Sequence, residues 1–262
     1  LGSCYGSTGP LSVNPQTGNP WFHAFPVLTN RDIVGAFELL RLHLGITKID
    51  ILMGGSMGGQ QVLEWAIMYP EAIQKIIPIA TNAFHSPWGI AFNETQRMAI
   101  EVDASWAENR VDSGMQGMKT ARAVAMLSYR TYKGYNLRQS ELDNDKIDGY
   151  RASSYQQYMG EKLGKRFNAY TYWYLSKAMD NHHIGRGRGD AKQALSSIQA
   201  QALVVALEGD ILFPPEEQRY IAEHIPHAQL VEIPSTFGHD GFLVESEALA
   251  QACQRFLASK VY

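Results

Sequence analysis

The chain has 262 residues, of which 45% are hydrophobic and 19% charged, and its formal net charge is −3. This length allows one substantial core, or one domain with an insertion. The sequence has no basic run typical of a nucleic-acid or membrane surface, and no apolar stretch reaches the roughly 18 residues of a membrane span.

The cysteines and histidines do not form a recognisable metal or disulfide pattern. Cys4 and Cys253 are too few for a disulfide framework and lack metal-ligand spacing. The His182-His183 pair has no carboxylate or cysteine at ligand spacing. We therefore expect no metal site, and a soluble protein in a reducing compartment, the cytoplasm.

The first part of the chain predicts a loop, then a helix, then a buried strand. Residues 1–30 are rich in Gly, Pro, Ser, Thr and Asn and should form loops. From Arg31, apolar residues recur at helical spacing, and Gly45 is a plausible C-cap. Residues 48–53 form a short apolar run, which suits a buried parallel strand.

A glycine-rich turn follows that strand directly. After the turn, a helical pattern continues until Pro70 stops it, and residues 75–80 predict a second strand. This strand, turn, helix and strand imply a βαβ unit with a right-handed crossover.

The segment 81–185 has a different composition. It is rich in Met, Tyr, Trp and Arg, predicts several helices and lacks an obvious strand. The α/β pattern then resumes with a helix near 191–198, a strand at 202–207, a helix at 215–224, a strand at 229–233 and a helix at 242–259. We expect an α/β fold with a mostly parallel sheet flanked by helices, its core formed by 1–80 and 186–262 and interrupted by a helical insertion at 81–185.

The run Gly54-Gly55-Ser56-Met57-Gly58 is the strongest chemical signal. A G-x-S-x-G pattern is weak alone, but this one lies between a predicted strand and a predicted helix. Such a turn exposes the serine hydroxyl and aims the Met57 N–H where an oxyanion would form. We predict Ser56 as nucleophile and Met57 as oxyanion donor. The alternative is a glycine-rich turn that only packs tightly or cradles a phosphate.

A nucleophilic serine needs a base and an orienting carboxylate, in the chain order Ser, acid, His. Asp210 follows one predicted strand, and His239 follows the next. Both lie just beyond the carboxyl ends of their strands, where open α/β sheets place their sites. We predict a catalytic triad of Ser56, Asp210 and His239, with Glu208 as the rival acid.

The run GGSMGGQQVLEWAIMYP at 54–70 resembles the homoserine O-acetyltransferase family. Other runs that carry the resemblance are GSTGP, FPVLTNRDIV, ATNAFHSPWGIAFNETQRMAI, ARAVAMLSYR, RFNAYTYWYLSKAMD, GDILFPPEEQ and GHDGFL. The resemblance implies an α/β-hydrolase fold with a helical lid and a homodimer formed through the lid. It also implies acetyl transfer from acetyl-CoA to L-homoserine, in methionine biosynthesis. Acetyl-CoA would be a co-substrate, with no bound cofactor.

The resemblance assigns further residues to the substrate. Arg122 would bind the substrate carboxylate with Tyr129 nearby, and Asp240 would hold the ammonium. A zwitterion needs one cation and one anion in fixed places, and arginine offers a bidentate fork to a carboxylate. From the residues alone, Arg122 reads more simply as an exposed helix arginine in an i,i+4 pair. Asp240 could be a helix N-cap, and it could serve both purposes.

The sequence departs from the family in two respects. Asn168 stands where the family usually has aspartate, which we expect to alter lid packing or dimer contacts. The family also has strands and a second oxyanion donor before the point where this chain begins, at Leu1. Without them the sheet would have an unpaired apolar edge, and a lost oxyanion donor costs on the order of 100- to 1000-fold in rate.

The mechanism implied is ping-pong, with an acyl-serine intermediate. The aromatic residues expected to keep water away, or simply to form the lid core, are Trp88, Trp106, Tyr129, Tyr172 and Trp173. One alternative is a serine esterase or thioesterase, and another is the same chemistry with succinyl-CoA or L-serine. A third is a catalytically inactive fold that serves as a binding module.

Overall fold

The computed structural model describes residues 1–259, which fold into two compact units. The unit that we call the helical unit consists of Leu1–Thr29, Pro87–Ser128 and Tyr132–Asp180. The unit that we call the sheet unit consists of Asn30–Ser86, Tyr129–Thr131 and the described residues from Asn181 onward. No helix in the described part of the chain is long and apolar enough to cross a bilayer.

The observed division lies close to the expected one but differs in four segments. Residues 1–29, expected in the core, group with the helical unit. Residues 81–86, Tyr129–Thr131 and 181–185, expected in the insertion, belong to the sheet unit. In the first segment, the Tyr5 ring packs on Phe167 at a centroid distance of 5.9 Å. Contacts of this kind hold the N-terminal loops to the helical unit.

The sheet is parallel throughout, as predicted. Its order is β1-β2-β3-β4 within the described residues. The strands are β1 (Ile49–Gly55), β2 (Ile73–Ile79), β3 (Gln201–Leu207) and β4 (Gln229–Ile233). Because every pairing is parallel, the carboxyl ends of the strands lie at one edge of the sheet.

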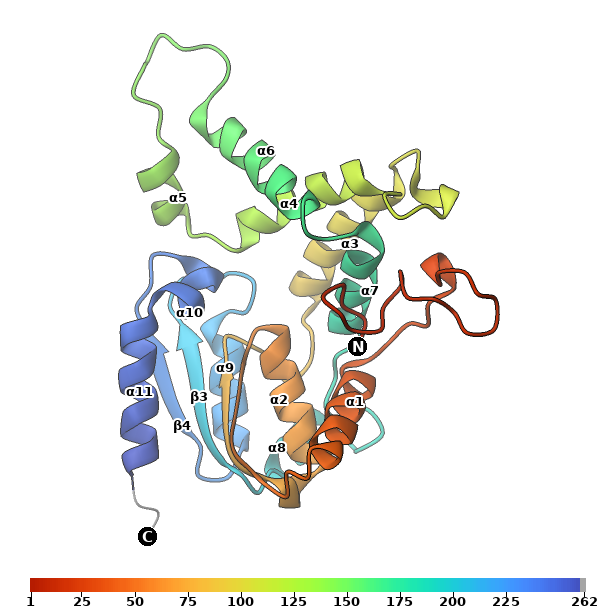
Figure 1. Ribbon diagram of the computed structural model, residues 1–262. Helices are drawn as coiled ribbons and strands as arrows, with labels where there is room; N and C mark the ends of the chain where they lie inside the picture. The colour runs from red at the N-terminus through yellow and green to blue at the C-terminus, as the bar shows by residue number, and fades with distance from the viewer. Residues whose placement is uncertain (260–262) are drawn as a thin grey trace. The chain divides into compact units, whose positions relative to one another are not determined.

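Helices cover both faces of this sheet (Figure 1). On one face lie α2 (Met57–Met68), α8 (Ala191–Ser196) and α9 (Pro215–His224), and on the other lies α11 (Ser246–Ala258). Adjacent strand residues point to opposite faces, so Ile76 packs with the first set of helices and Ile77 with α11. Burial on both faces explains the continuous apolar runs at 76–79 of β2 and 202–207 of β3.

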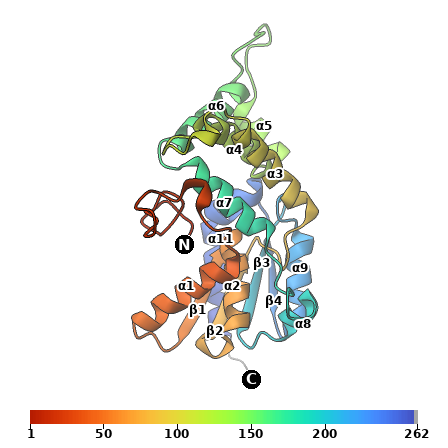
Figure 2. The ribbon, with the colours of Figure 1, turned by 90° about the vertical axis from the view of Figure 1, so that its right-hand side faces the viewer.

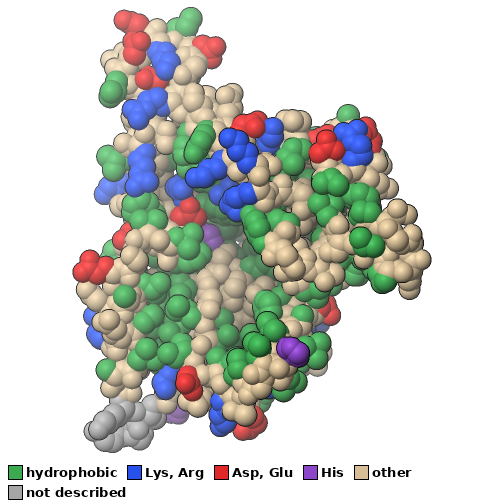
Figure 3. Space-filling view, in the orientation of Figure 1, with side chains coloured by type: hydrophobic (Ala, Val, Ile, Leu, Met, Phe, Trp, Pro, Cys, Tyr) green, Lys and Arg blue, Asp and Glu red, His purple; other side chains and the backbone are tan. Residues whose placement is uncertain are grey.

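β1 has the character of an apolar edge strand, because in the described part of the chain it pairs with β2 alone. Its residues Ile51 and Met53 are 42% and 56% exposed. The helix α1 (Asn30–His43), which packs on α2, also exposes leucines, among them Leu39 at 70%. Figure 3 shows apolar side chains gathered on this face of the sheet unit.

The expected single helix at 242–259 is wrong, because the chain forms α10 (Gly241–Val244) and then α11. The break falls at Glu245, whose ψ of 46° is not helical. Phe242 of α10 contacts the His239 ring and also packs against the apolar cluster that contains Phe256 of α11.

The helical unit consists mainly of α3 (Pro87–Glu101), α4 (Met115–Ser128), α5 (Tyr132–Gln139), α6 (Arg151–Gly164) and α7 (Ala169–Asp180). In it, α3 packs against α4 and α7, and α4 packs against α6 (Figure 2). At the α3–α4 contact, a Cβ on Gly117 would lie 2.3 Å from the Ala99 carbonyl oxygen. Only glycine therefore permits this close approach.

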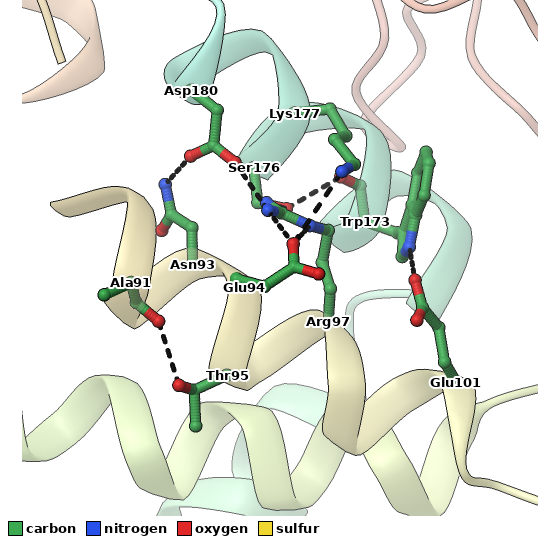
Figure 4. A network of polar contacts seen from close by, with 10 residues as sticks. All are labelled: Ala91, Asn93, Glu94, Thr95, Arg97, Glu101, Trp173, Ser176, Lys177 and Asp180. Carbon is green, nitrogen blue, oxygen red and sulfur yellow. Dashed lines mark hydrogen bonds and ion pairs between the residues drawn. The ribbon is translucent and has the colours of Figure 1, made fainter. Parts of the chain in front are cut away.

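A buried ion network joins α3 to α7 (Figure 4). The Arg97 side chain is 1% exposed, forms ion pairs with Glu94 and Asp180, and donates to Ser176 Oγ at 3.0 Å. A guanidinium so deeply buried is tolerated only with partners on several sides.

Asn168 lies at the start of α7. Its Oδ1 accepts a hydrogen bond from the Thr171 N–H at 2.8 Å, so it caps the helix. An aspartate could do the same, so the departure from the family pattern preserves this cap.

Candidate active site

Ser56 occupies a strained turn between β1 and α2. Its φ of 57° and ψ of −127° are unusual for a residue with a side chain. Hydrogen bonds fix the turn: the Ser56 N–H donates to Ile79 O at 2.9 Å, and Ser56 O accepts from Gly59 N at 2.9 Å and Thr81 Oγ1 at 2.8 Å. The surrounding structure thus holds the serine in a conformation that it would not adopt alone.

The turn also demands close backbone approach. A Cβ on Gly54 would lie 2.5 Å from Gly58 O, and a Cβ on Gly59 would lie 2.6 Å from Thr81 Cβ. A Cβ on Gly58 itself would meet nothing within 4 Å. A Cβ on Gly55 would lie 2.6 Å from Phe242 Cε2. The steric demand of the turn therefore falls on Gly54, Gly55 and Gly59.

The predicted triad residues lie within hydrogen-bond distance of one another. His239 Nε2 lies 2.9 Å from Ser56 Oγ, and His239 Nδ1 lies 2.7 Å from Asp210 Oδ2. The other Asp210 oxygen accepts from the N–H groups of Leu212 and Phe213 at 2.8 and 2.9 Å. An ionised carboxylate only accepts, so Nδ1 carries the proton and Nε2 can accept from the serine hydroxyl.

Burial separates the two candidate acids. Asp210 is 3% exposed and contacts the histidine, whereas Glu208 is exposed. His239 is itself 4% exposed. The geometry therefore favours Asp210 as the partner of the base.

Aromatic rings surround the imidazole. Phe213 stacks on His239 at 5.1 Å, and Phe242 and Tyr129 lie at 5.5 and 5.6 Å. Sequence reasoning identified Tyr129 but missed both phenylalanines. The available signal was their position, three residues after Asp210 and three after His239.

Met57 is the first residue of α2. The N–H groups of the first helical turn have no intrahelical acceptor and lie at the positive end of the helix dipole. The role of the Met57 N–H as oxyanion donor stays a prediction, which this position at the start of α2 supports.

The predicted substrate residues fall in both units. Tyr129 and Asp240 lie beside His239 in the sheet unit, and Arg122 is a half-buried residue of α4 in the helical unit. Asp240 is the N-cap residue of α10, yet its side chain makes no capping hydrogen bond. It forms an ion pair with Arg130 instead, a residue that the sequence analysis did not single out.

The aromatic residues expected to exclude water have local partners. Trp106 packs on Tyr170 at 4.9 Å, and Trp173 Nε1 donates to Glu101 at 2.7 Å. Trp88 is 54% exposed. The first two thus contribute to the packing of the helical unit itself.

A buried polar cluster extends from α2 to α9 and was not predicted. Asn30 Nδ2 donates to Gln60 Oε1, and Gln60 Nε2 donates to Asn82 Oδ1, both at 2.9 Å. Burial raises the pKa of the nearby Glu217 to about 7, repulsion from Asp210 adds to this, and a hydrogen bond from Asn82 opposes it.

The two adjacent histidines have separate environments. His182 is buried and donates from Nε2 to Asn82 O at 3.0 Å, and burial lowers its pKa to about 3. His183 stacks on Phe84. Among the described residues, no group of three or more His, Cys, Asp or Glu side chains is arranged to hold a metal ion.

Known proteins share this architecture. The family described as "alpha/beta hydrolase fold" matches residues 1–246. A homoserine O-acetyltransferase of Cyclobacterium marinum is 51% identical over 256 residues, which cover 98% of this chain and 73% of that protein.

Two crystal structures are also similar. A homoserine O-acetyltransferase from Staphylococcus aureus has a TM-score of 0.81 and 32% identity, covering 100% of this chain and 72% of that one. The esterase E22 has a TM-score of 0.86 and 26% identity, covering 96% and 72%. The chain thus shares its fold with both transferases and an esterase.

Proposed function

We propose that this chain transfers an acetyl group from acetyl-CoA to the hydroxyl of L-homoserine. The premise is that the chain belongs to the homoserine O-acetyltransferases, which have the α/β-hydrolase fold. The observation that carries the proposal is the hydrogen-bonded series Ser56, His239 and Asp210 in a chain 51% identical to such an enzyme. The triad supports acyl transfer, and the relatives' names indicate the substrates. The product would serve methionine biosynthesis.

In the first half-reaction, Ser56 Oγ attacks the thioester carbonyl carbon of acetyl-CoA while His239 Nε2 takes its proton. The Met57 N–H stabilises the oxyanion of the tetrahedral intermediate. The C–S bond then breaks, and His239 returns the proton to the departing sulfur. Coenzyme A leaves as a thiol, and Ser56 carries the acetyl group as an ester.

In the second half-reaction, the hydroxyl of L-homoserine gives its proton to His239 Nε2 and its oxygen attacks the acetyl carbonyl. The bond to Ser56 Oγ breaks, and His239 returns the proton to the serine. Asp210 holds the imidazole in the required tautomer and stabilises the imidazolium in both steps. Acetyl-CoA is thus a co-substrate, and the chemistry needs no bound cofactor.

Recognition of the acceptor rests on family resemblance and charge. We assign the substrate carboxylate to Arg122 and its ammonium to Asp240, with Tyr129 beside the base. We also assign the protein to the cytoplasm, as a homodimer formed through its helical unit. Its free thiols, Cys4 and Cys253, suit a reducing compartment.

Hydrolysis by the same triad is the second candidate function. It is supported by the likeness to the esterase E22, because an esterase differs only in using water as the acyl acceptor. The two functions are separated by the fate of the acetyl group.

The test is to incubate the protein with acetyl-CoA and L-homoserine and to quantify O-acetyl-L-homoserine and free acetate. A transferase yields mainly the ester, and gives parallel double-reciprocal plots when both substrates are varied. Mainly acetate, whatever the homoserine concentration, would contradict the proposal and favour the esterase. Succinyl-CoA and L-serine, tested in parallel, identify the preferred donor and acceptor.

A further inference from the structure

A short segment between α4 and α5 is built into the sheet unit. Tyr129–Thr131 belongs to that unit, although the chain on either side of it belongs to the helical unit. The segment is hydrogen-bonded to the loop that carries His239. Thr131 Oγ1 donates to Thr236 O at 2.5 Å, and the Asp240 N–H donates to Tyr129 O at 3.4 Å. The loop is thus held on both sides of the base.

The packing of this segment leaves no room for larger neighbours. Gly238 has a φ of 62°, and a Cβ there would lie 3.1 Å from Arg130 C and from Thr131 N. A Cβ on Gly209, next to the triad acid, would lie 3.0 Å from Thr131 Cγ2. The segment therefore contacts the loops of both the base and the acid.

Arg130 adds a charged contact to this arrangement. Its Nη1 forms an ion pair with Oδ2 of Asp240, and the two side chains are 19% and 22% exposed. Both side chains are thus mostly buried, and the contact restrains their conformations. Its main physical effect is to fix the direction of the Asp240 carboxylate, which is adjacent to His239.

We infer that Arg130 is a positioning residue for the acceptor: it orients Asp240 so that the carboxylate receives the acceptor's ammonium and brings the hydroxyl to His239. The inference rests on the proposed function. Because Arg130 engages Oδ2, the ammonium is received by Oδ1, in a direction set by the guanidinium. Small misplacements of a reacting group have large effects on rate, so Arg130 accelerates transfer to acceptors that carry an amino group.

The test separates the two half-reactions in the wild type, Arg130→Met and Arg130→Lys. Acetyl-enzyme formation is followed by the release of coenzyme A. Its discharge is then timed with L-homoserine and with 4-hydroxybutanoate, which lacks the amino group. The matched control is Arg219→Met, which removes an arginine paired with Glu232 at 2.7 Å elsewhere in the sheet unit.

In Arg130→Met, we expect discharge by L-homoserine to slow roughly 10- to 100-fold. Acetylation and discharge by 4-hydroxybutanoate should stay close to the wild type, as should every step of Arg219→Met. Arg130→Lys should recover part of the loss. In an Asp240→Asn background, Arg130→Met should have little further effect, because the two residues act through one contact.

The inference would be overturned if Arg130→Met slowed discharge by L-homoserine and by 4-hydroxybutanoate equally, or slowed acetylation and discharge equally. Arg130 would then only hold the loop. An undiminished effect of Arg130→Met in the Asp240→Asn background would overturn it as well. A wild-type protein that forms no acetyl-enzyme, or whose acetyl-enzyme L-homoserine discharges no faster than water, would overturn the proposed function itself.

Discussion

His239 Nε2 lies 2.9 Å from Ser56 Oγ, and 183 positions of sequence separate the two residues. Ser56 follows β1 and His239 follows β4, the strands at opposite ends of the described sheet, while Asp210 follows β3. Parallel strands end at one edge, so each turn delivers its residue to the same place. The site therefore depends on the order of the strands as much as on the motifs.

Replacing Asp210 by asparagine should reduce kcat about 1,000- to 10,000-fold, because an amide can donate to Nδ1 and so favour the wrong imidazole tautomer. The fold should tolerate the change, since Oδ1 can still accept from Leu212 and Phe213. The measurement is kcat beside the thermal unfolding midpoint. Glu208→Gln is the control and should be nearly as active as the wild type. If Glu208→Gln lowered kcat more than Asp210→Asn did, Glu208 would be the acid that orients His239.

Gly54→Ala should disrupt the nucleophile turn, because the new Cβ would lie 2.5 Å from Gly58 O. We expect a loss of about 1 to 3 kcal/mol in the free energy of unfolding, together with lower activity. Gly58→Ala is the matched variant: its Cβ meets nothing within 4 Å, so its unfolding free energy should not fall. Urea titration measures both, and equal destabilisation would argue against this packing.

The sheet and the triad were predictable because their signals are local. Apolar runs interrupted by turns indicated the strands, and the glycines around Ser56 indicated the strained turn. The order of Ser56, Asp210 and His239 then matched the strand ends. Each strand and each turn is visible in a short stretch of sequence, and the chain order of the three residues is read directly from their numbers.

The remaining features depend on contacts between distant residues. Nothing periodic links Tyr5 to Phe167, so the grouping of residues 1–29 with the helical unit was missed. The pair between Arg130 and Asp240 joins residues 110 positions apart, and the sequence offered Asp240 only the substrate ammonium or a helix cap as partners. Such pairings are set by tertiary structure, which single-residue preferences do not encode.

Arg97→Met should weaken the helical unit, because it leaves Asp180 and Glu94 without their shared cation. Breaking a buried ion pair costs about 3 to 5 kcal/mol, and the half-exposed Glu94 places the expected loss near the lower end. The control is Arg110→Met: that arginine is 57% exposed in its ion pairs, which predicts a loss of at most about 1 kcal/mol. Urea unfolding of the two variants provides the comparison, and equal losses would contradict the network's role.

Glu217 should make stability depend on pH. Its folded pKa of about 7 lies above the ordinary value of 4.5, so ionisation opposes folding. The stability that the protonated Glu217 side chain contributes is fully present below pH 4.5 and is lost as the pH rises through about 7. As the pH rises between these values, Glu217→Gln should therefore become more stable than the wild type, by on the order of 1 to 3 kcal/mol in the free energy of unfolding.

Unfolding by urea at pH 5 and pH 8 tests this dependence. Glu216→Gln is the control, because that side chain is 73% exposed and should behave alike at both pH values. A difference between Glu217→Gln and the wild type that is the same at both pH values would show that Glu217 ionises normally.

The most direct test of the account is intact-mass spectrometry after mixing the protein with acetyl-CoA, with Ser56→Ala alongside. We predict the gain of one acetyl group in the wild type only, discharged by L-homoserine much faster than by water. An adduct that also forms on Ser56→Ala, or no adduct at all, would contradict the assignment of Ser56 as nucleophile. An adduct that water discharges as fast as L-homoserine would contradict the transferase.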